Sequence, residues 1–306
     1  MVLLIKFTLL YAVVLMFVAL GGMFSERSGI INIALEGIMT IGALVGALIL
    51  AVLQKTVMAP WLIVTISILS AAIAGMLYSS LLAFASINLK ADQTIGGTAL
   101  NMLATALAMI VVKRFNGNDS AKLAYLNDDF MFEIGSLQLN VFLILGIVVL
   151  IAAYIIMYKT KFGLRLSACG EHPQAADSVG INVYKMRWAG VLISGVLGGI
   201  GGLAYVVPSV QTWNFEVGVT GMGFLALSVM IFGQWKPLHI ALAACFFALF
   251  KSLGNIYDST FLRVLEFPKE IYYMMPFIAS MIVLAFTSKK SRAPKAEGIP
   301  YDKGSR

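Results

Sequence analysis

The stretch KTKFGLRLSACGEHPQAADSVGINVYKMR, residues 159–187, separates two apolar segments, 138–158 and 188–207, that are each long enough to span a bilayer. It carries five Lys or Arg residues and only two acidic ones. Its centre, residues 173–179, predicts one short helix, because its proline suits a first helical turn and Gly180 suits the position after the last turn. A short helix held between two spans is typical of a segment that docks onto a partner.

The composition is that of a membrane protein. Hydrophobic residues make up 60% of the 306 residues, charged residues make up 12%, and the mean hydropathy is +0.90. Because the few charges gather between long apolar runs, we expect an all-α fold, a polytopic helical bundle in the membrane. The net charge of +7 does not indicate nucleic-acid binding, since its placement between the runs follows membrane topology.

About nine apolar runs, with a range of eight to ten, are candidates for transmembrane helices. The run 219–233 is short for a spanning helix and could be tilted or re-entrant. The run 30–53 begins with polar residues, so its first turns could be broken or line a cavity. The full set comprises residues 2–24, 30–53, 61–87, 95–115, 138–158, 188–207, 219–233, 238–256 and 271–287.

We interpret residues 1–287 as one transmembrane domain and residues 288–306 as a polar, disordered tail. If all nine runs cross the membrane, 14 of the 22 Lys and Arg residues lie on the side of the loop 159–187. The other side then has a net charge near zero. Since positive charge accumulates on the cytoplasmic side, we predict that this loop and the C-terminus are cytoplasmic and the N-terminus is outside. If one run is re-entrant, the N-terminus lies inside instead, and the later spans keep their orientation.

Two polar stripes lie within the apolar runs. Asn32 and Glu36 share a helix face, and Glu36 is the only carboxylate well inside a run. An acid at that depth costs about 2.5–3.5 kcal/mol on insertion scales unless it is paired, protonated or near water. Thr98 and Asn101 lie on a second stripe, in the run 95–115. Both stripes could line the path of a polar solute such as a sugar or nucleoside, or form hydrogen bonds between helices.

Glycines recur at helical spacing in the run 188–207. Gly195 and Gly199 form one pair of small residues four positions apart, and Gly198 and Gly202 form another. In lipid the hydrophobic effect does not drive helices together, so close backbone packing must supply the attraction. The stripe therefore predicts tight helix packing, and a gating role for this face is the alternative.

The sequence contains no pattern typical of an enzyme, a cofactor site or a metal site. The phosphate loop Gly-x-x-x-x-Gly-Lys-Ser/Thr is missing, so ATP could drive this protein only through an ATPase on another chain. The two cysteines and two histidines lack metal-ligand spacing. No Asp, His and Lys relay crosses the apolar runs, which argues against proton coupling. Glu36 nevertheless leaves an ion-coupled secondary transporter as an alternative.

One long block resembles a known family. GLRLSACGEHPQAADSVGINVYKMRWAGVLISGVLGGIGG, residues 163–202, is similar to the loop-and-helix signature of bacterial ABC importer permeases of the ribose/branched-chain amino acid type. Within that group the chain most resembles the nucleoside and simple-sugar branch. Three further blocks resemble the same group: ERSGIINIALEGIMTIGAL (26–44), GFLALSVMIFGQWKPL (223–238) and KEIYYMMPFIASMIVL (269–284).

This resemblance implies a permease of the bacterial plasma membrane with a vitamin B12-importer-like helical fold. It also implies three partners: a second permease (a copy or a paralogue), a tandem-domain cytoplasmic ATPase, and an extracellular substrate-binding lipoprotein. In that family the short loop helix fits a groove of the ATPase. Carried onto this sequence, the coupling residues are Gly170, Pro173, Ala175, Ala176, Asp177 and Gly180.

Overall fold

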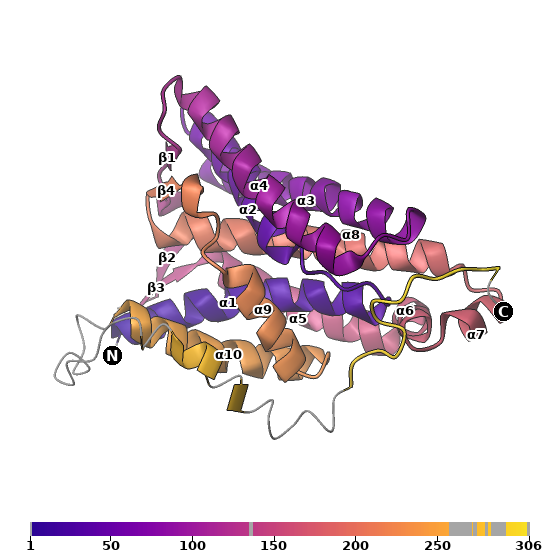
Figure 1. Cartoon of the computed structure of the whole chain (residues 1–306). Coiled ribbons are helices and arrows are strands. Elements are labelled where there is room, and N and C mark those ends of the chain that lie inside the picture. The colour runs from indigo at the N-terminus through magenta and orange to yellow at the C-terminus, as the bar shows by residue number, and fades with distance from the viewer. Residues whose placement is uncertain are drawn as a thin grey trace.

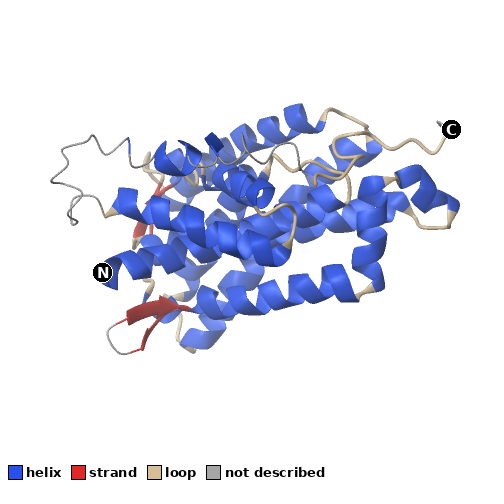
Figure 2. Ribbon diagram, turned by 90° about the horizontal axis from the view of Figure 1, so that it is seen from below, coloured by secondary structure: helices blue, strands red, loops and turns tan. Residues whose placement is uncertain are grey.

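The structure, a computed structural model, describes residues 2–134, 137–256, 271, 274–278, 281–282 and 292–304. Within these residues the chain forms a bundle of long helices with short strands at one end (Figures 1 and 2). Seven helices among the described residues are long and apolar enough to cross a membrane, so the predicted polytopic bundle is confirmed. They are α1 (Val2–Arg27), α2 (Leu35–Leu53), α3 (Pro60–Ala83), α4 (Gln93–Asn116), α5 (Val141–Lys159), α8 (Val183–Ser209) and α10 (Pro237–Asn255).

Two of the nine predicted runs need separate comment. The run 219–233 contains only α9 (Met222–Phe232), which is too short to span a bilayer as a helix. Most of the run 271–287 lies outside the described residues. Because neither run forms a spanning helix among the described residues, the number of spans and the vitamin B12-importer-like fold stay predictions.

A short π-helical segment, η1 (Phe84–Asn88), extends α3.

Short strands, absent from the all-α prediction, lie at the end of the bundle that also holds the N-terminus (Figure 1). Chain outside the hydrocarbon need not be helical, because water can satisfy its backbone groups. The strands β1 (Lys122–Ala124) and β4 (Thr212–Asn214) pair antiparallel, as do β2 (Met131–Ile134) and β3 (Leu137–Asn140). The 3₁₀ helices η2 (Asp128–Phe130) and η3 (Phe215–Val217) flank them.

At the opposite end lie the loop between α5 and α8 and the C-terminus (Figures 1 and 2). Lys90, between α3 and α4, forms an ion pair with Asp302 of the tail, with 2.8 Å between Nζ and Oδ2. Arg27, which ends α1, donates from Nη2 to the carbonyl oxygen of Trp235 over 3.3 Å. The segments that carry Arg27, Lys90 and Trp235 therefore lie at the same end of the bundle as the tail.

The loop 159–187 contains two helices rather than the one predicted. The expected short helix is α7 (Pro173–Ser178), and α6 (Lys161–Glu171) precedes it. The α6 helix buries Leu166 and Cys169 on one face. Apolar residues at this spacing are typical of an amphipathic helix.

The centre of the bundle is α8, whose glycines allow α3 to approach closely. A Cβ atom added to Gly195 would lie 2.6 Å from the carbonyl oxygen of Gly75, and one added to Gly199 would lie 2.2 Å from that of Ala71. Cβ atoms do not come this close to backbone oxygens. The contact therefore requires glycine at both positions of α8.

The other pair of glycines in α8 faces α2. A Cβ atom added to Gly202 would lie 2.0 Å from the carbonyl oxygen of Met39, and one added to Gly198 would lie 2.8 Å from Cγ2 of Ile38. Gly42 of α2 approaches α8 in the same way. All four glycines singled out in the sequence thus lie at helix contacts of α8, which is the geometry that tight packing requires.

We expect Gly199→Ala to destabilise the protein in detergent by about 1–3 kcal/mol, because the added methyl group must displace the backbone of α3. The matched control is Gly96→Ala in α4, since a Cβ atom there would have nothing within 4 Å. The midpoint of thermal unfolding should fall for the first variant and stay or rise slightly for the second. Equal midpoints for the two variants would contradict this account of packing.

Candidate functional site

The chain is not helical between α1 and α2, at residues 28–34, although these residues are mostly buried. Side chains of α4 bond to the backbone there. Gln93 Oε1 accepts a hydrogen bond from the N–H of Ile31 over 2.7 Å, and Asn101 Nδ2 donates one to the carbonyl oxygen of Ile33 over 2.9 Å. The expectation that the second apolar run starts with a break is therefore confirmed.

A second break precedes α9. The α8 helix ends at the strands, whereas α10 begins beside the last residue of α5 at the opposite end, so residues 210–236 cross the bundle. Only α9 is a regular α-helix within that segment. Gly218, Thr220 and Gly221 just before it have φ angles of +56°, +55° and +80°, a conformation that favours glycine. The short apolar run 219–233 therefore contains a half-helix, α9, and an irregular segment precedes it.

Glu36 joins the two breaks. Its Oε1 accepts a hydrogen bond from the N–H of Gly221 and its Oε2 accepts one from the N–H of Gly223, each over 2.7 Å. The first turn of a helix has N–H groups without intrahelical partners and carries the positive end of the helix dipole. The carboxylate of Glu36, in the first turn of α2, therefore caps α9. A Cβ atom on Gly223 would lie 2.5 Å from the Glu36 nitrogen, so only glycine permits this approach.

A cavity of about 520 Å³ opens beside this junction, between α2, α4 and α9. It brings together Glu36, Thr98 and Asn101, three of the four residues predicted to line a solute path. Asn101 also holds the break in place, because its Oδ1 accepts from the N–H of Gly37 over 2.7 Å. The rest of the wall combines one hydroxyl with apolar groups: Met102, Thr105, Ala106, Met109 and Phe224.

Asn32, the fourth predicted path residue, lies apart from this cavity. Its side chain is fully buried, and Nδ2 donates to the hydroxyl oxygen of Ser194 in α8 over 2.8 Å. This contact fits the interpretation that Asn32 forms a structural hydrogen bond to a neighbouring helix. Asn32 itself lies in the break, so it does not share a helix face with Glu36 as the spacing predicted. Its Oδ1 has no partner among the described residues.

The C-terminal tail packs against the segment that contains α6 and α7. The N–H of Ala296 donates to the carbonyl oxygen of Gly170 over 2.8 Å, and Arg187 Nη1 donates to that of Ile299 over 2.9 Å. Arg187 itself is only 1% exposed. The expectation of a disordered tail is therefore wrong for residues 292–304. The composition of the tail suggested disorder, but several of its residues are buried against the helices.

The electrostatics of the tail are those of a surface contact. Hydrogen bonding to Lys90 lowers the pKa of Asp302, and the same bond raises the pKa of Lys90. Because the pKa of Asp302 is lowered in the docked state, the ion pair stabilises docking of the tail at pH values above the ordinary carboxyl pKa. This stabilisation is lost as the pH falls through the lowered pKa. Both groups are exposed, so this contribution is small. Beneath the tail, burial raises the pKa of the Cys169 thiol to about 11.

The six predicted coupling residues divide into two groups. Ala176, only 4% exposed, clusters with Cys169 and Tyr301 inside the chain, so it cannot itself meet a partner while the tail is docked. Gly170 and Pro173 are also buried, whereas Asp177 is half-buried and Ala175 and Gly180 are exposed. Two apolar side chains extend the exposed face: Val179, 74% exposed, and Leu164, 73% exposed.

Sequence reasoning missed several of these contacts. Trp235 Nε1 donates to Oε2 of the buried Glu26 over 2.6 Å, and nothing in the spacing of the two residues signals that pair. The capping glycines did leave a signal. Gly218 precedes an unusually short apolar run, and Gly221 and Gly223 lie at its start, a pattern typical of a discontinuous transmembrane helix.

Residues 4–285 match the family described as branched-chain amino acid transport system / permease component. The chain belongs to this permease family. It is 43% identical over 309 residues to the nucleoside ABC transporter permease protein NupC of Lactococcus lactis subsp. cremoris, covering 96% of this chain and 95% of the relative. It is 39% identical over 312 residues to the guanosine ABC transporter permease protein NupQ of Bacillus subtilis, covering 98% and 96%.

A more distant relative is the putative glucose ABC transporter permease protein TsgC13 of Haloferax volcanii, 28% identical over 265 residues, which covers 82% of this chain and 76% of the relative. No solved structure gives a significant match. The predicted resemblance to ABC importer permeases is confirmed, and the chain is a multi-pass transport subunit rather than an enzyme. The ion-coupled alternative that used Glu36 receives no support.

We expect Glu36→Gln to lower the stability of the detergent-purified protein, because an amide offers one acceptor oxygen where the carboxylate offers two. One N–H of the first turn of α9 then loses its partner, at a cost of about 1–3 kcal/mol if that group is shielded from water. Thr105→Val is the control, since Thr105 lines the same cavity but its hydroxyl bonds only within α4. Thermal unfolding checks both variants. Wild-type stability for Glu36→Gln together with altered pH dependence of transport would instead support a protonation role.

Proposed function

We propose that this chain is the permease subunit of an ATP-driven importer for nucleosides. The observation that carries the proposal is the similarity, along nearly the whole chain, to permeases named for nucleosides and for guanosine. A simple sugar is the second candidate solute, because a glucose permease is among the relatives. That relative is less similar and is matched over a smaller part of its length.

We propose the cavity between α2, α4 and α9 as part of the solute path. Its chemistry suits an uncharged solute with one flat apolar part and several hydroxyl groups. The exposed ring of Phe224 offers a surface on which a nucleobase can stack, and the hydroxyls of Thr98 and Thr105 can bond to a ribose. Because Glu36 touches both the cavity and the start of α9, movement of α9 would change the wall of the path.

A second permease, either a copy or a paralogue, would complete this path. The α4 helix forms one wall of the cavity, yet much of its own surface is uncovered. Ile95, Met102 and Ile110 of α4 are exposed. Pairing of two permeases along this helix would enclose the cavity between them, as an alternating-access mechanism requires.

The exposed face of α7 supports a role in coupling to the ATPase. Ala175 and Val179 present a small apolar surface that a groove of the partner could receive. The buried side of the same segment leads into the bundle, since a Cβ atom on Gly170 would lie 2.4 Å from the carbonyl oxygen of Arg27. Arg27 immediately precedes the break at residues 28–34. A push on α7 would therefore reach that break through α6.

The placement of charge supports the proposed orientation. Basic residues predominate at the end of the bundle that holds α6, α7 and the tail, so we propose that this end and the C-terminus are cytoplasmic. The opposite end, with the paired strands, would then face the substrate-binding lipoprotein. We also propose that the cytoplasmic ATPase at the other end has two domains in tandem on one chain.

We expect Val179→Asp to reduce ATP-dependent guanosine uptake by at least about tenfold, the effect of about 1.4 kcal/mol of lost docking free energy. An exposed site should tolerate the charge in folding, so membrane levels of the protein should not change. Val179→Leu keeps the apolar contact and is the matched control. This pair is more informative than Ala176→Arg, since Ala176 is buried and a charge there would disturb the fold. Normal uptake by Val179→Asp would refute docking at this face.

A further inference from the structure

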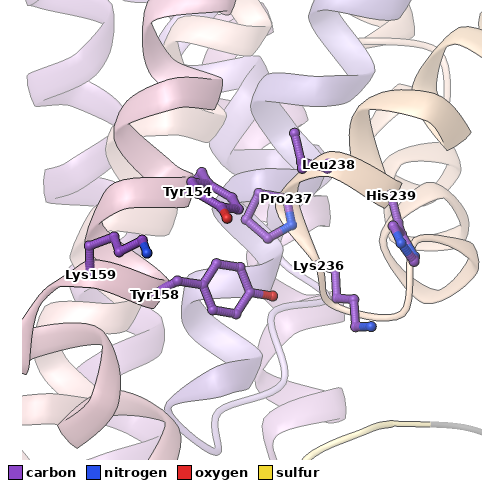
Figure 3. A pocket seen from close by; sticks show the side chains of 7 residues that line it. All are labelled: Tyr154, Tyr158, Lys159, Lys236, Pro237, Leu238 and His239. Carbon is purple, nitrogen blue, oxygen red and sulfur yellow. The ribbon is translucent and has the colours of Figure 1, made fainter.

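A basic cavity of about 370 Å³ lies at the same end of the bundle as α6 and α7, away from the proposed solute path. One wall is the end of α5, and the other is the turn that leads from α9 into α10. Figure 3 shows Lys159 and Lys236 on opposite walls, with the ring of Tyr158 between them. The lining residues are Tyr154, Tyr158, Lys159, Lys236, Pro237, Leu238 and His239.

The part of the chain that the structure describes does not neutralise the positive charge of this cavity. Within the described residues, neither Lys159 nor Lys236 has a carboxylate at ion-pair distance. An adjoining cavity of about 460 Å³ shares Tyr158 and Lys159 and adds Arg27 and Lys161. Among the described residues, none of those that line either cavity is acidic. Four cations therefore surround one tyrosine, and an anion would relieve their mutual repulsion.

The start of α10 adds backbone donors to the same place. The helix begins at Pro237, and no side chain caps it. Leu238 and His239, in its first turn, both line the cavity. N–H groups of a first helical turn lack intrahelical acceptors and favour negative charge. They support the anion site that the lysines define.

Apolar surface continues from the cavity along both helices. Leu242 of α10 is 72% exposed, and other exposed apolar side chains follow it toward the strand end. In a bilayer these faces of α5 and α10 lie against hydrocarbon. The exposed residues are Ile144, Ile147 and Ile151 of α5, and Leu242, Phe246 and Leu249 of α10. A ligand that fits this surface has an anionic head and apolar chains.

We propose that the cavity binds the phosphate headgroup of an anionic phospholipid. Lys159 and Lys236 hold the phosphate from two sides, the Tyr158 hydroxyl donates to it, and the acyl chains lie along α5 and α10. A soluble anion would use the lysines but not the apolar faces. No residue of α7, which we propose to meet the ATPase, is among those that line this cavity. Because Lys159 ends α5 just before α6, a bound lipid would brace the base of the coupling segment.

Lipid binding to the full-length protein in dodecyl maltoside tests the proposal, with bound lipid counted by native mass spectrometry. Dioleoyl phosphatidylglycerol should bind at least about tenfold more tightly than dioleoyl phosphatidylcholine, which has the same chains and no net charge. The double variant Lys159→Gln/Lys236→Gln should lose that preference. Lys159→Arg/Lys236→Arg should keep it, which separates loss of charge from misfolding. Lys113→Gln/Arg114→Gln, at the far end of α4, is the matched control and should behave as wild type.

Three results would overturn the proposal. Equal affinity for the two lipids would mean that the lysines do not select a headgroup. Displacement of phosphatidylglycerol by inorganic phosphate at equal concentration would identify a soluble anion as the ligand. Normal lipid binding by Lys159→Gln/Lys236→Gln, together with loss of co-purification with the ATPase subunit, would assign the lysines to that protein instead.

Discussion

Backbone groups that water cannot reach must find their partners within the protein, and this constraint governs the two breaks in the bundle. Residues 28–34 and the turn at 218–221 leave the regular helix, and so expose N–H and carbonyl groups. The carboxylate of Glu36 satisfies two of these groups at the start of α9. Asn101 bonds to Ile33 within the first break and to Gly37 at the start of α2. The acid that suggested ion coupling is thus the link that holds two irregular segments together.

This arrangement connects the parts that transport requires. Glu36 lies at the wall of the cavity and at the cap of α9, while residues 28–34 follow directly from Arg27, against which Gly170 packs. The route that we propose from α7 to the cavity runs through α6, the end of α1 and the first break. The glycine face of α8 serves a different purpose, since it fixes α2 and α3 at a close distance. Movement is easier at a break than across such a packed face.

The sequence predicted the features that depend on solvent and on local pattern. The apolar runs, the grouping of loops and the glycine contacts all follow from what lipid, water and close packing require of each residue. Pairings between distant residues could not be predicted, because nothing local identifies Gly221 and Gly223 as the partners of Glu36. The tail was misjudged for the same reason. Its composition suggested disorder, whereas Ala296 and Tyr301 are buried against helices more than 100 residues away in sequence.

The central claim is that ATP hydrolysis by a partner chain, rather than an ion gradient, drives a nucleoside through this permease. Reconstitution of the complex into proteoliposomes tests it most directly, with radiolabelled guanosine and its binding protein on one side and ATP on the other. We predict uptake that requires ATP and the ATPase subunit, that excess unlabelled nucleoside abolishes, and that collapse of proton and sodium gradients leaves unchanged. Uptake by the permease alone, driven by an imposed proton gradient without ATP, would contradict the account.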